Sequence, residues 1–342
     1  MSVEEVVELL KQLQLKEAQL EGSLADYLKD ARVTGGVLSL VFELPRPGLE
    51  DLIRSKVYDA LKDRFEKLEV RFLQKGTPVA SSPAFTRKQV PGVKHLVAVG
   101  SGKGGVGKST VAVNLALALS RLGYRVGLLD ADVYGPSVPT LMGLKGARVE
   151  VDEARRLVPV EKEGIKVLSI GFMLPSEDTP VIWRGPMLMR ALMDFLFNTA
   201  WGELDYLIMD LPPGTGDVQI TLAQHAKLDG SLVVTTPQDV ALADVKKAVN
   251  MFKEVGVPVL GVVENMAYFK CPSDGKAYYI FGKGKVEEFA RSYGLPLLGS
   301  IPVDPELSRA SDEGRPVVLY YPESESAKAF MSLARALVEK TS

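Results

Sequence analysis

The chain has 342 residues, of which 46% are hydrophobic and 25% charged, and this balance is typical of a globular protein with a full-sized core and more than one domain. Its formal net charge of −2 argues against a basic nucleic-acid-binding surface, so we expect no nucleic acid partner. One cysteine excludes an internal disulfide framework and fits a reducing compartment.

The two ends of the chain predict a cytoplasmic protein with no stable membrane insertion. The start, MSVEEVVELLKQLQ, carries acidic residues and no cationic stretch before its apolar positions, unlike a signal peptide. No uninterrupted apolar run reaches membrane-spanning length. The amphipathic C-terminal stretch SAKAFMSLARALVEK has few basic residues, which favours docking on the protein over membrane binding.

Residues 1–75 predict a small α/β domain. VEEVVELLKQLQL and LEDLIRSKVYDALKDRF have apolar residues at helical spacing, whereas GGVLSLVFELP and KLEVRFLQ are typical of strands. Residues 76–94 follow, rich in proline, serine and small residues, and we interpret them as a linker.

Residues 95–342 predict a doubly wound, mostly parallel α/β sheet. Short apolar runs without alternation, such as HLVAVGS, YLIMDLPPG and GSLVVTTP, are typical of strands covered on both faces. Helical patterns such as STVAVNLALALSRLG lie between them, which indicates helices on both sides of the sheet. In such sheets ligands bind beyond the carboxyl ends of the strands.

The stretch from Gly102 to Ser109 matches the phosphate-binding pattern G-x-x-x-x-G-K-S, between a predicted strand and a predicted helix. Backbone amides of such a loop surround a phosphate, Lys108 reaches the β- and γ-phosphates, and the Ser109 hydroxyl binds Mg²⁺. We therefore expect ATP and Mg²⁺ as cofactors, with nucleotide contacts from Gly102, Lys103, Gly104, Gly105, Val106, Gly107, Lys108, Ser109 and Thr110.

Carboxylates end two of the predicted strands. LLDADVYGPS places Asp130 and Asp132 at the end of one strand, where they can hold magnesium, orient an attacking water or cap the following turn. Asp210 follows the apolar residues of YLIMD, an arrangement that delivers one carboxylate beside the metal of a P-loop protein. The turn-prone residues 212–216 then suit a segment that senses the γ-phosphate through backbone amides.

Two later strand ends are candidates for contact with the nucleotide base. Asn265 in VVENMAYF can both donate to and accept from a purine edge, and Pro302 lies in SIPVDPEL after the last predicted strand. A turn role is an equal alternative for each.

Lys103 is a second lysine within the phosphate loop, in KGGVGKS, and its alternative is a solvated side chain. This loop resembles the deviant Walker A motif of the class that includes MinD, ParA, ArsA and the nitrogenase iron protein. The resemblance implies that Lys103 crosses a homodimer interface and neutralises transition-state charge in the partner's site. It also implies a first switch at LLDADVYGPS, with Asp132 positioning the water and Asp130 in the metal region. The catalytic residues would be Lys103, Lys108 and Asp132.

Longer segments resemble the Mrp/ApbC family of iron–sulfur cluster carrier ATPases within that class. They include DADVYGPSVP, DLPPGTGD, VVTTPQDVALADV and GVVENMAYFKCP, and with the others they cover most of residues 95–340. The resemblance implies an ATPase that releases ADP and phosphate, with apo iron–sulfur client or assembly proteins as partners. The small N-terminal domain is similar in position to the assembly-associated domain of many such carriers, but it lacks their cysteine and acidic-proline signature.

The cysteine pattern departs from that family. Its members commonly have two cysteines two residues apart after this strand, whereas here Cys271 is followed by Asp274 in CPSDGK. A symmetric dimer would offer two thiolates as metal ligands, completed by harder carboxylate or outside ligands, to an iron–sulfur cluster. The alternative for Cys271 is a small apolar core residue.

The leading hypothesis is therefore an ATP-binding and hydrolysing carrier or assembly factor for iron–sulfur clusters, acting as a nucleotide-switched homodimer. The first alternative is a positioning or regulatory ATPase like MinD or ParA, which the near-neutral charge does not favour. The second is an ATP-driven protein scaffold without a cluster, which the incomplete cysteine pair favours.

Overall fold

The structure is a computed structural model that describes residues 3–14, 22–34, 37–44, 49–62, 64–65, 67–74, 87–173 and 185–342. The chain divides into two compact units, Met1–Ala84 and Phe85–Ser342, each of which we describe by itself. Most of the predicted linker lies outside the described residues. Residues 87–94 belong to the large unit, since the backbone N–H of Lys88 donates to the carbonyl of His225 and strand β4 already begins at Val93.

The small unit is a three-stranded sheet with helices packed on it. Its elements are α1 (Val3–Gln12), the 3₁₀ helix η2 (Leu24–Tyr27), β1 (Leu28–Thr34), β2 (Val37–Leu44), α2 (Glu50–Leu61) and β3 (Lys67–Gln74). Strand β2 lies in the centre, antiparallel to β1 and parallel to β3.

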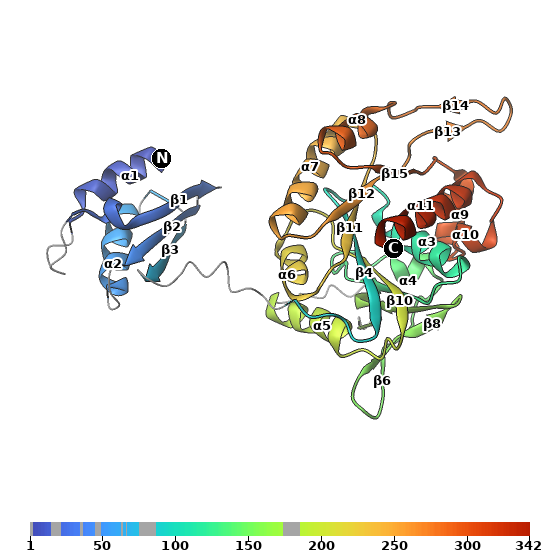
Figure 1. Ribbon diagram of the computed structural model, residues 1–342, viewed down its shortest axis with the longest axis horizontal. Coiled ribbons are helices and arrows are strands. Elements are labelled where there is room, and N and C mark those ends of the chain that lie inside the picture. Colours follow the sequence, from blue (N-terminus) through green and yellow to red (C-terminus); the bar gives the residue numbers. More distant parts are fainter. Residues whose placement is uncertain are drawn as a thin grey trace. The chain divides into compact units, whose positions relative to one another are not determined.

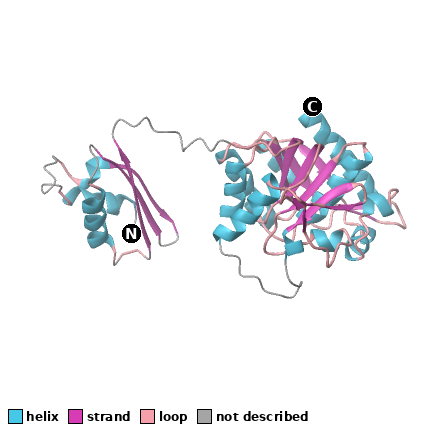
Figure 2. Ribbon diagram, turned by 90° about the horizontal axis from the view of Figure 1, so that it is seen from below, coloured by secondary structure: helices cyan, strands magenta, loops and turns pink. Residues whose placement is uncertain are grey.

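Helices α1 and α2 cover one face of this sheet (Figure 2). Every second residue of β2 is buried, because successive side chains of a strand point to opposite faces. Leu38, Leu40 and Phe42 face the helices, where they join Val6 of α1 and Ile53 of α2. Strand β1 was not predicted, because its sequence LKDARVT lacks the alternation of apolar residues that would have marked it.

The large unit contains an eight-stranded sheet of order β15-β12-β11-β4-β10-β5-β9-β8. Neighbouring strands are parallel except β8 and β9, which form an antiparallel edge, so the predicted doubly wound, mostly parallel fold is confirmed. The strands are β4 (Val93–Ser101), β5 (Val126–Asp130), β8 (Val160–Lys162), β9 (Ile165–Ser169), β10 (Leu204–Asp210), β11 (Gly230–Thr235), β12 (Val259–Glu264) and β15 (Leu297–Ser300). Two small hairpins lie outside it, β6 (Glu150–Val151) with β7 (Leu157–Val158) and β13 (Phe269–Lys270) with β14 (Ala277–Tyr278).

Helices cover both faces of the sheet, with α3, α4 and α9–α11 on one side and α5–α8 on the other (Figure 1). They are α3 (Lys108–Arg121), α4 (Val138–Leu141), the 3₁₀ helix η3 (Ile170–Met173), α5 (Gly185–Phe197), α6 (Asp217–His225), α7 (Asp239–Glu254), α8 (Lys285–Ser292), α9 (Pro305–Asp312), α10 (Val317–Tyr320) and α11 (Glu325–Thr341).

Helix α3 is buried along most of its length because the C-terminal helix α11 packs on its outer side. Phe330, Leu333 and Leu337 of α11 are fully buried, so this amphipathic helix docks on the protein, as expected. None of the described helices is long and apolar enough to span a bilayer. The arrangement sets the loop before α3 at the carboxyl edge of the sheet, next to the ends of β10 and β5.

Candidate active site

The phosphate loop connects β4 to α3, and close contacts require glycine at two of its positions. Gly107 has a left-handed φ of 79°, and a Cβ there would collide with the side-chain amide of Asn265. A Cβ at Gly102 would collide with the backbone of Asp244 in α7. A Cβ at Gly104 or Gly105 would instead meet no atom within 4 Å, so the loop has one open side where a ligand can approach.

Lys108 lies among carboxylates at the carboxyl edge of the sheet. Its Nζ is 2.5 Å from Oδ1 of Asp210 and 3.5 Å from Oδ2 of Asp132, and only 6% of the lysine side chain is exposed. Strands β10 and β5 are parallel neighbours that pair Asp210 with Asp130 in register, which is why three acids from two strands meet here. A buried cation held by acids is poised for exchange with a phosphate group.

Asp130 is committed to the structure of the following turn. Its Oδ2 accepts a hydrogen bond from Ser169 Oγ at 2.8 Å, and its Oδ1 accepts one from the backbone N–H of Asp132 at 3.1 Å. Burial, followed by the nearby charge of Asp210, raises the pKa of Asp130 to about 7. These contacts favour the turn role for Asp130, and of the two acids in LLDADVYGPS it is Asp132 that pairs with Lys108. Ser169 was not predicted.

Asp210 meets the requirements of a magnesium ligand. Burial raises its pKa, and the charge of Lys108 and the hydroxyl of Ser109 oppose that shift. Within the described residues, its Oδ2 is a buried oxygen without a hydrogen-bond partner. A buried acceptor left unpaired is costly unless a ligand completes it, and Mg²⁺ prefers carboxylate and hydroxyl oxygens. Asp210 and Ser109 together therefore fit the ion that the sequence predicts.

The predicted γ-phosphate sensor, residues 212–216, is held by a residue that sequence reasoning missed. Gln219 Nε2 donates to the carbonyls of Pro212, Pro213 and Gly214 at 2.9, 3.0 and 3.2 Å. The backbone N–H of Gly214 donates to the carbonyl of Ser101 at the end of β4. The only sequence signal for Gln219 is its place in the first turn of the helix that follows the loop.

Asn265 contacts the phosphate loop itself. Its Nδ2 donates to the carbonyl of Val106 at 2.9 Å, and the residue is 5% exposed. Pro302 is buried beyond β15, next to Ile301, whose N–H donates to the carbonyl of Glu264. Both lie at the same edge of the sheet as the loop, and contact of either with a nucleotide base stays a prediction.

Cys271 lies directly after β13, at the start of the turn between β13 and β14, and it is partly exposed, unlike a core residue. Its N–H donates to the carbonyl of Lys276, and its Sγ is 3.0 Å from Ser273 Oγ. The hydroxyl of Ser273 lowers the pKa of the Cys271 thiol, chiefly by hydrogen bonding. The thiolate is the nucleophilic and metal-binding form of cysteine.

Asp274, which stands where a second cysteine was expected, closes the hairpin turn. Its Oδ1 accepts from the N–H of Lys276 and its Oδ2 from the hydroxyl of Tyr278, both at 2.9 Å. Across the part of the chain that the structure describes, no group of three or more His, Cys, Asp or Glu side chains is arranged to hold a metal ion. A cluster on Cys271 would therefore need ligands from outside one chain.

A family model described as "ParA: NUBPL iron-transfer P-loop NTPase" matches residues 92–338, which is most of the large unit and includes both the phosphate loop and the cysteine hairpin. The chain belongs to this family. The resemblance inferred from the sequence is therefore confirmed, and the protein is a nucleotide-binding P-loop NTPase.

Individual relatives of this NUBPL-family NTPase support the same family assignment. It is 63% identical over 355 aligned residues to an "Iron-sulfur cluster carrier protein" of Aquifex aeolicus, with 98% of each chain covered. The nucleotide-binding protein of Archaeoglobus fulgidus, solved in complex with ADP, is 43% identical with a TM-score of 0.60, covering 70% of this chain and 96% of its own. The cell division ATPase MinD of Pyrococcus furiosus is 25% identical with a TM-score of 0.54, covering 72% and 99%.

In this family member Lys103 has no ion-pair partner among the residues that the structure describes. The residue is half-buried, and its backbone carbonyl accepts from Ser101 Oγ at 2.9 Å. Its ammonium group pairs with no carboxylate among the described residues, whereas Lys108 in the same loop pairs with two. Lys103 is thus the cation of the loop that is available to a ligand or a second chain.

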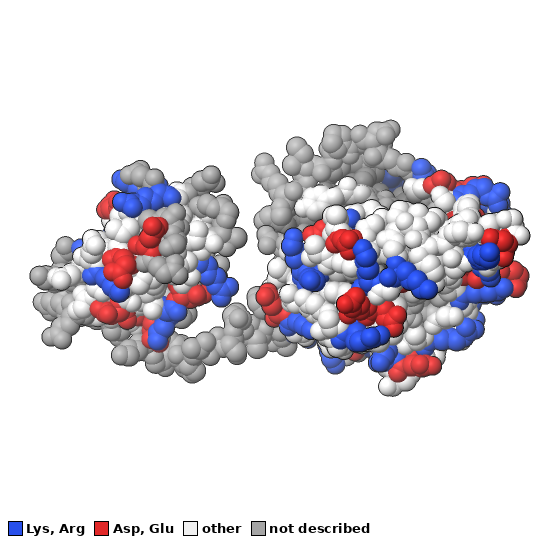
Figure 3. All heavy atoms as spheres, turned by 90° about the horizontal axis from the view of Figure 1, so that it is seen from above, with Lys and Arg blue, Asp and Glu red and all other residues white. Residues whose placement is uncertain are grey.

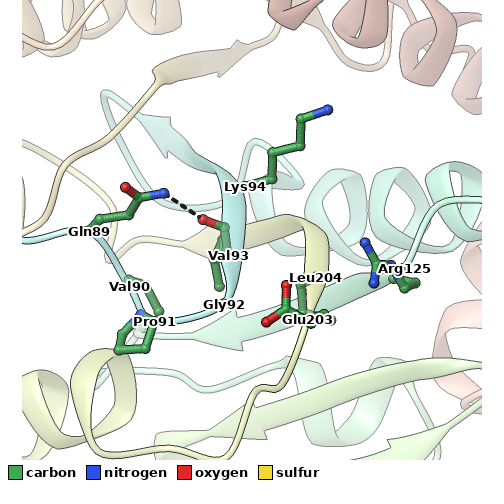
Figure 4. A pocket seen from close by; sticks show the side chains of 9 residues that line it. All are labelled: Gln89, Val90, Pro91, Gly92, Val93, Lys94, Arg125, Glu203 and Leu204. Atoms are coloured by element: carbon green, nitrogen blue, oxygen red, sulfur yellow. Dashed lines mark hydrogen bonds between the residues drawn. The ribbon is translucent and has the colours of Figure 1, made fainter.

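A pocket of about 490 Å³ lies at the opposite, amino-terminal edge of the sheet (Figure 4). It is lined by Gln89, Val90, Pro91, Gly92, Val93, Lys94, Arg125, Glu203 and Leu204. The guanidinium of Arg125 is already paired with Asp205 at 3.0 Å, so this pocket presents no convergent phosphate-binding set. On the face that Figure 3 shows, Lys and Arg side chains are interspersed with Asp and Glu instead of gathering by sign.

Proposed function

We propose that this NTPase hydrolyses ATP and carries iron–sulfur clusters as a nucleotide-switched homodimer. One observation carries the proposal: the chain's single cysteine is partly exposed, with a lowered pKa, on a hairpin that follows directly from the strand end touching the phosphate loop. The name of the Aquifex aeolicus relative, which is similar over nearly its whole length, supports the same function.

Nucleotide binding follows from the charges of the loop. A phosphate entering the open side of the loop competes with Asp210 and Asp132 for the ammonium of Lys108. Ser109 and Asp210 would hold Mg²⁺, which neutralises charge on the β- and γ-phosphates. The loop amides and the N-terminus of α3 add the favourable field of a helix start.

Hydrolysis requires a water held in line with the γ-phosphorus. We assign its orientation to Asp132, whose Oδ1 accepts from the N–H of Tyr134 and whose other oxygen faces Lys108. The water oxygen bonds to the γ-phosphorus, the bridging oxygen leaves on ADP, and phosphate is released. Lys103, which pairs with no carboxylate in the described part of its own chain, would neutralise the developing charge in the partner's site.

The cargo site would be built from two copies of the hairpin. Each chain supplies one thiolate, so a homodimer offers two soft ligands to a cluster, and client or assembly proteins or small molecules supply the rest. Asp274 is a poor candidate for completion, because its oxygens already bond to Lys276 and Tyr278. We therefore expect a labile cluster suited to transfer.

Anaerobic reconstitution with iron and sulfide tests this proposal. Bound iron and sulfide per dimer and the visible absorbance are measured for wild type, Cys271→Ser and Asp274→Cys. We expect binding in wild type, none in Cys271→Ser, and more iron with slower loss in Asp274→Cys. Ser332→Cys, which adds a thiol on an exposed turn of α11, controls for iron held by any extra cysteine.

Transfer to an apo iron–sulfur protein completes the test. Equal iron in wild type and Cys271→Ser, or none in either, would refute cluster carriage. The chain would then be an ATP-driven scaffold. This alternative is favoured by Asp274, because both of its carboxylate oxygens already accept hydrogen bonds within the hairpin.

A further inference from the structure

A short segment joins the phosphate loop to the cysteine hairpin. Strand β12 ends at Glu264 and β13 begins at Phe269, so residues 265–268 are the whole connection. At its start, Asn265 is nearly fully buried and its amide donates to the carbonyl of Val106 in the phosphate loop. The same amide lies so close to Gly107 that no Cβ would fit there. A shift of the loop at either residue must displace Asn265 or break its hydrogen bond.

Backbone hydrogen bonds hold the connection in place, so it cannot easily absorb such a shift. The N–H of Asn265 donates to Thr235 at 2.8 Å, and the N–H of Ala267 donates to Ile301 at 2.9 Å. The carbonyl of Tyr268 accepts from Val303 at 2.7 Å. Between them, Met266 has a left-handed φ of 53°, a conformation that is unfavourable for a residue with a side chain and that persists only where its surroundings impose it.

The loop lysine can exchange one set of partners for another. In the structure, Lys108 is held by Asp210 and Asp132. With a phosphate bound, that ammonium and the loop amides have a new partner, and the backbone around Val106 and Gly107 must adjust to it.

We propose that Asn265 is a positioning residue that transmits the nucleotide state of the phosphate loop to the Cys271 hairpin and so changes the accessibility of the thiol. The biological purpose of this coupling, which would be the release or capture of a cluster, rests on the proposed function. The coupling itself does not, because it is a property of the polypeptide that exists without any cluster.

A second connection reaches the hairpin and serves as a comparison. Lys270 pairs with Glu325 at the start of α11 at 2.8 Å, and α11 packs on α3. Both side chains are nearly half exposed, and exposed pairs of this kind contribute little. We therefore expect Glu325→Gln to change the basal mobility of the hairpin and to leave its response to nucleotide intact.

The single cysteine makes the coupling measurable, because any thiol reagent reports on Cys271 alone. Cluster-free protein is labelled with a maleimide without nucleotide, with saturating Mg-ADP and with a saturating Mg-bound non-hydrolysable ATP analogue. In wild type we expect the labelling rates to differ by about fivefold or more between states, the lower end of typical allosteric coupling. In Asn265→Ala, labelled at nucleotide concentrations that direct titration shows to saturate this variant, we expect the ratio of rates to approach one. By linkage, blocking Cys271 should shift nucleotide affinity in wild type but not in this variant.

Controls separate positioning from general destabilisation. Thr199→Val removes another buried side-chain bond to a carbonyl, that of Asp194, far from the loop, and should keep the wild-type ratio. Asn265→Asp keeps the size of the side chain but removes the donor, so its labelling rates should also become equal between nucleotide states. This variant replaces Asn265→Ala in the test if Asn265→Ala folds poorly. Hydrogen exchange of residues 265–278 in wild type gives an independent measure.

The inference would be overturned if the Cys271 labelling rate and the hydrogen-exchange rate of wild type were the same with and without nucleotide. It would also be overturned if both Asn265 variants kept the wild-type ratio of labelling rates. Iron loading of the same preparations is measured separately. Coupling without iron binding would defeat the proposed cargo and leave the role of Asn265 standing. Iron binding without coupling would support the proposed cargo and refute the role of Asn265.

Discussion

Replacing Lys108 with methionine removes the cation between the carboxylates of Asp210 and Asp132 while keeping a side chain of similar length. The lysine is 6% exposed and Asp210 is fully buried, so water cannot solvate the carboxylates in place of the lost ammonium group. Removing one partner of a buried pair costs about 3–5 kcal/mol. We expect that loss of unfolding free energy in nucleotide-free, Mg²⁺-free protein at about pH 8, together with loss of nucleotide binding.

The loss should shrink in acid, and its sign follows from the pKa of Asp210. Burial already raises that pKa in the folded state, and Lys108 holds it down, so the substitution raises it further. A carboxyl with a raised folded pKa holds its proton where the unfolded chain has released it, so stability falls as pH rises through that window. The deficit of Lys108→Met should therefore be smaller at about pH 5 than at about pH 8.

Urea unfolding followed by tryptophan fluorescence measures this deficit in the large unit, because both tryptophans, Trp183 and Trp201, lie between residues 85 and 342. The double variant Lys108→Met with Asp210→Asn should recover most of the loss, since it removes the unpaired charge. A single variant within about 1 kcal/mol of wild type at about pH 8, or a double variant that recovers nothing, would refute the buried-pair argument.

Three further outcomes are expected. Lys103→Ala should retain nucleotide binding but lose ATP hydrolysis and nucleotide-dependent dimerisation, measured by phosphate release and light scattering; normal hydrolysis by a monomer would contradict a role in trans. Ser273→Ala should move the pH midpoint of Cys271 labelling upward, because the thiolate loses its main hydrogen bond; an unchanged midpoint would show that Ser273 does not stabilise it. Asp130→Asn should gain stability relative to wild type as pH rises from about 4 to about 7, because the folded pKa of Asp130 is raised to about 7; a constant difference in urea unfolding would count against that raised pKa.

Much of the large unit could be predicted because its signals are local. An uninterrupted apolar run such as LVAVGS is typical of a strand covered on both faces, and β4 follows it to Ser101. The spacing from Gly102 to Ser109 determines a loop whose backbone can surround a phosphate, and that loop lies between β4 and α3 as expected. Asp130, Asp132 and Asp210 were predicted as site residues because they stand at or just after the ends of such runs.

Other residues depend on contacts between segments far apart in the chain, and local patterns carry no information about them. Gln219 and Ser169 matter through their hydrogen bonds to the 212–214 carbonyls and to Asp130, which exist only once helix and strand ends meet. Strand β1 is recognisable only by its pairing with β2, because an edge strand with polar residues shows no alternation.

Cys271 and Asn265 show the same division. The sequence determined that one thiol, lacking a second cysteine at Asp274, would follow the predicted strand end that carries Asn265. Only the tertiary structure decided that Asp274 closes the hairpin turn and that the amide of Asn265 contacts Val106, 159 positions earlier in the chain. The reason is physical: a hydrogen bond is set by the meeting of two groups in space, and the parallel order of β4, β11 and β12 brings these two together.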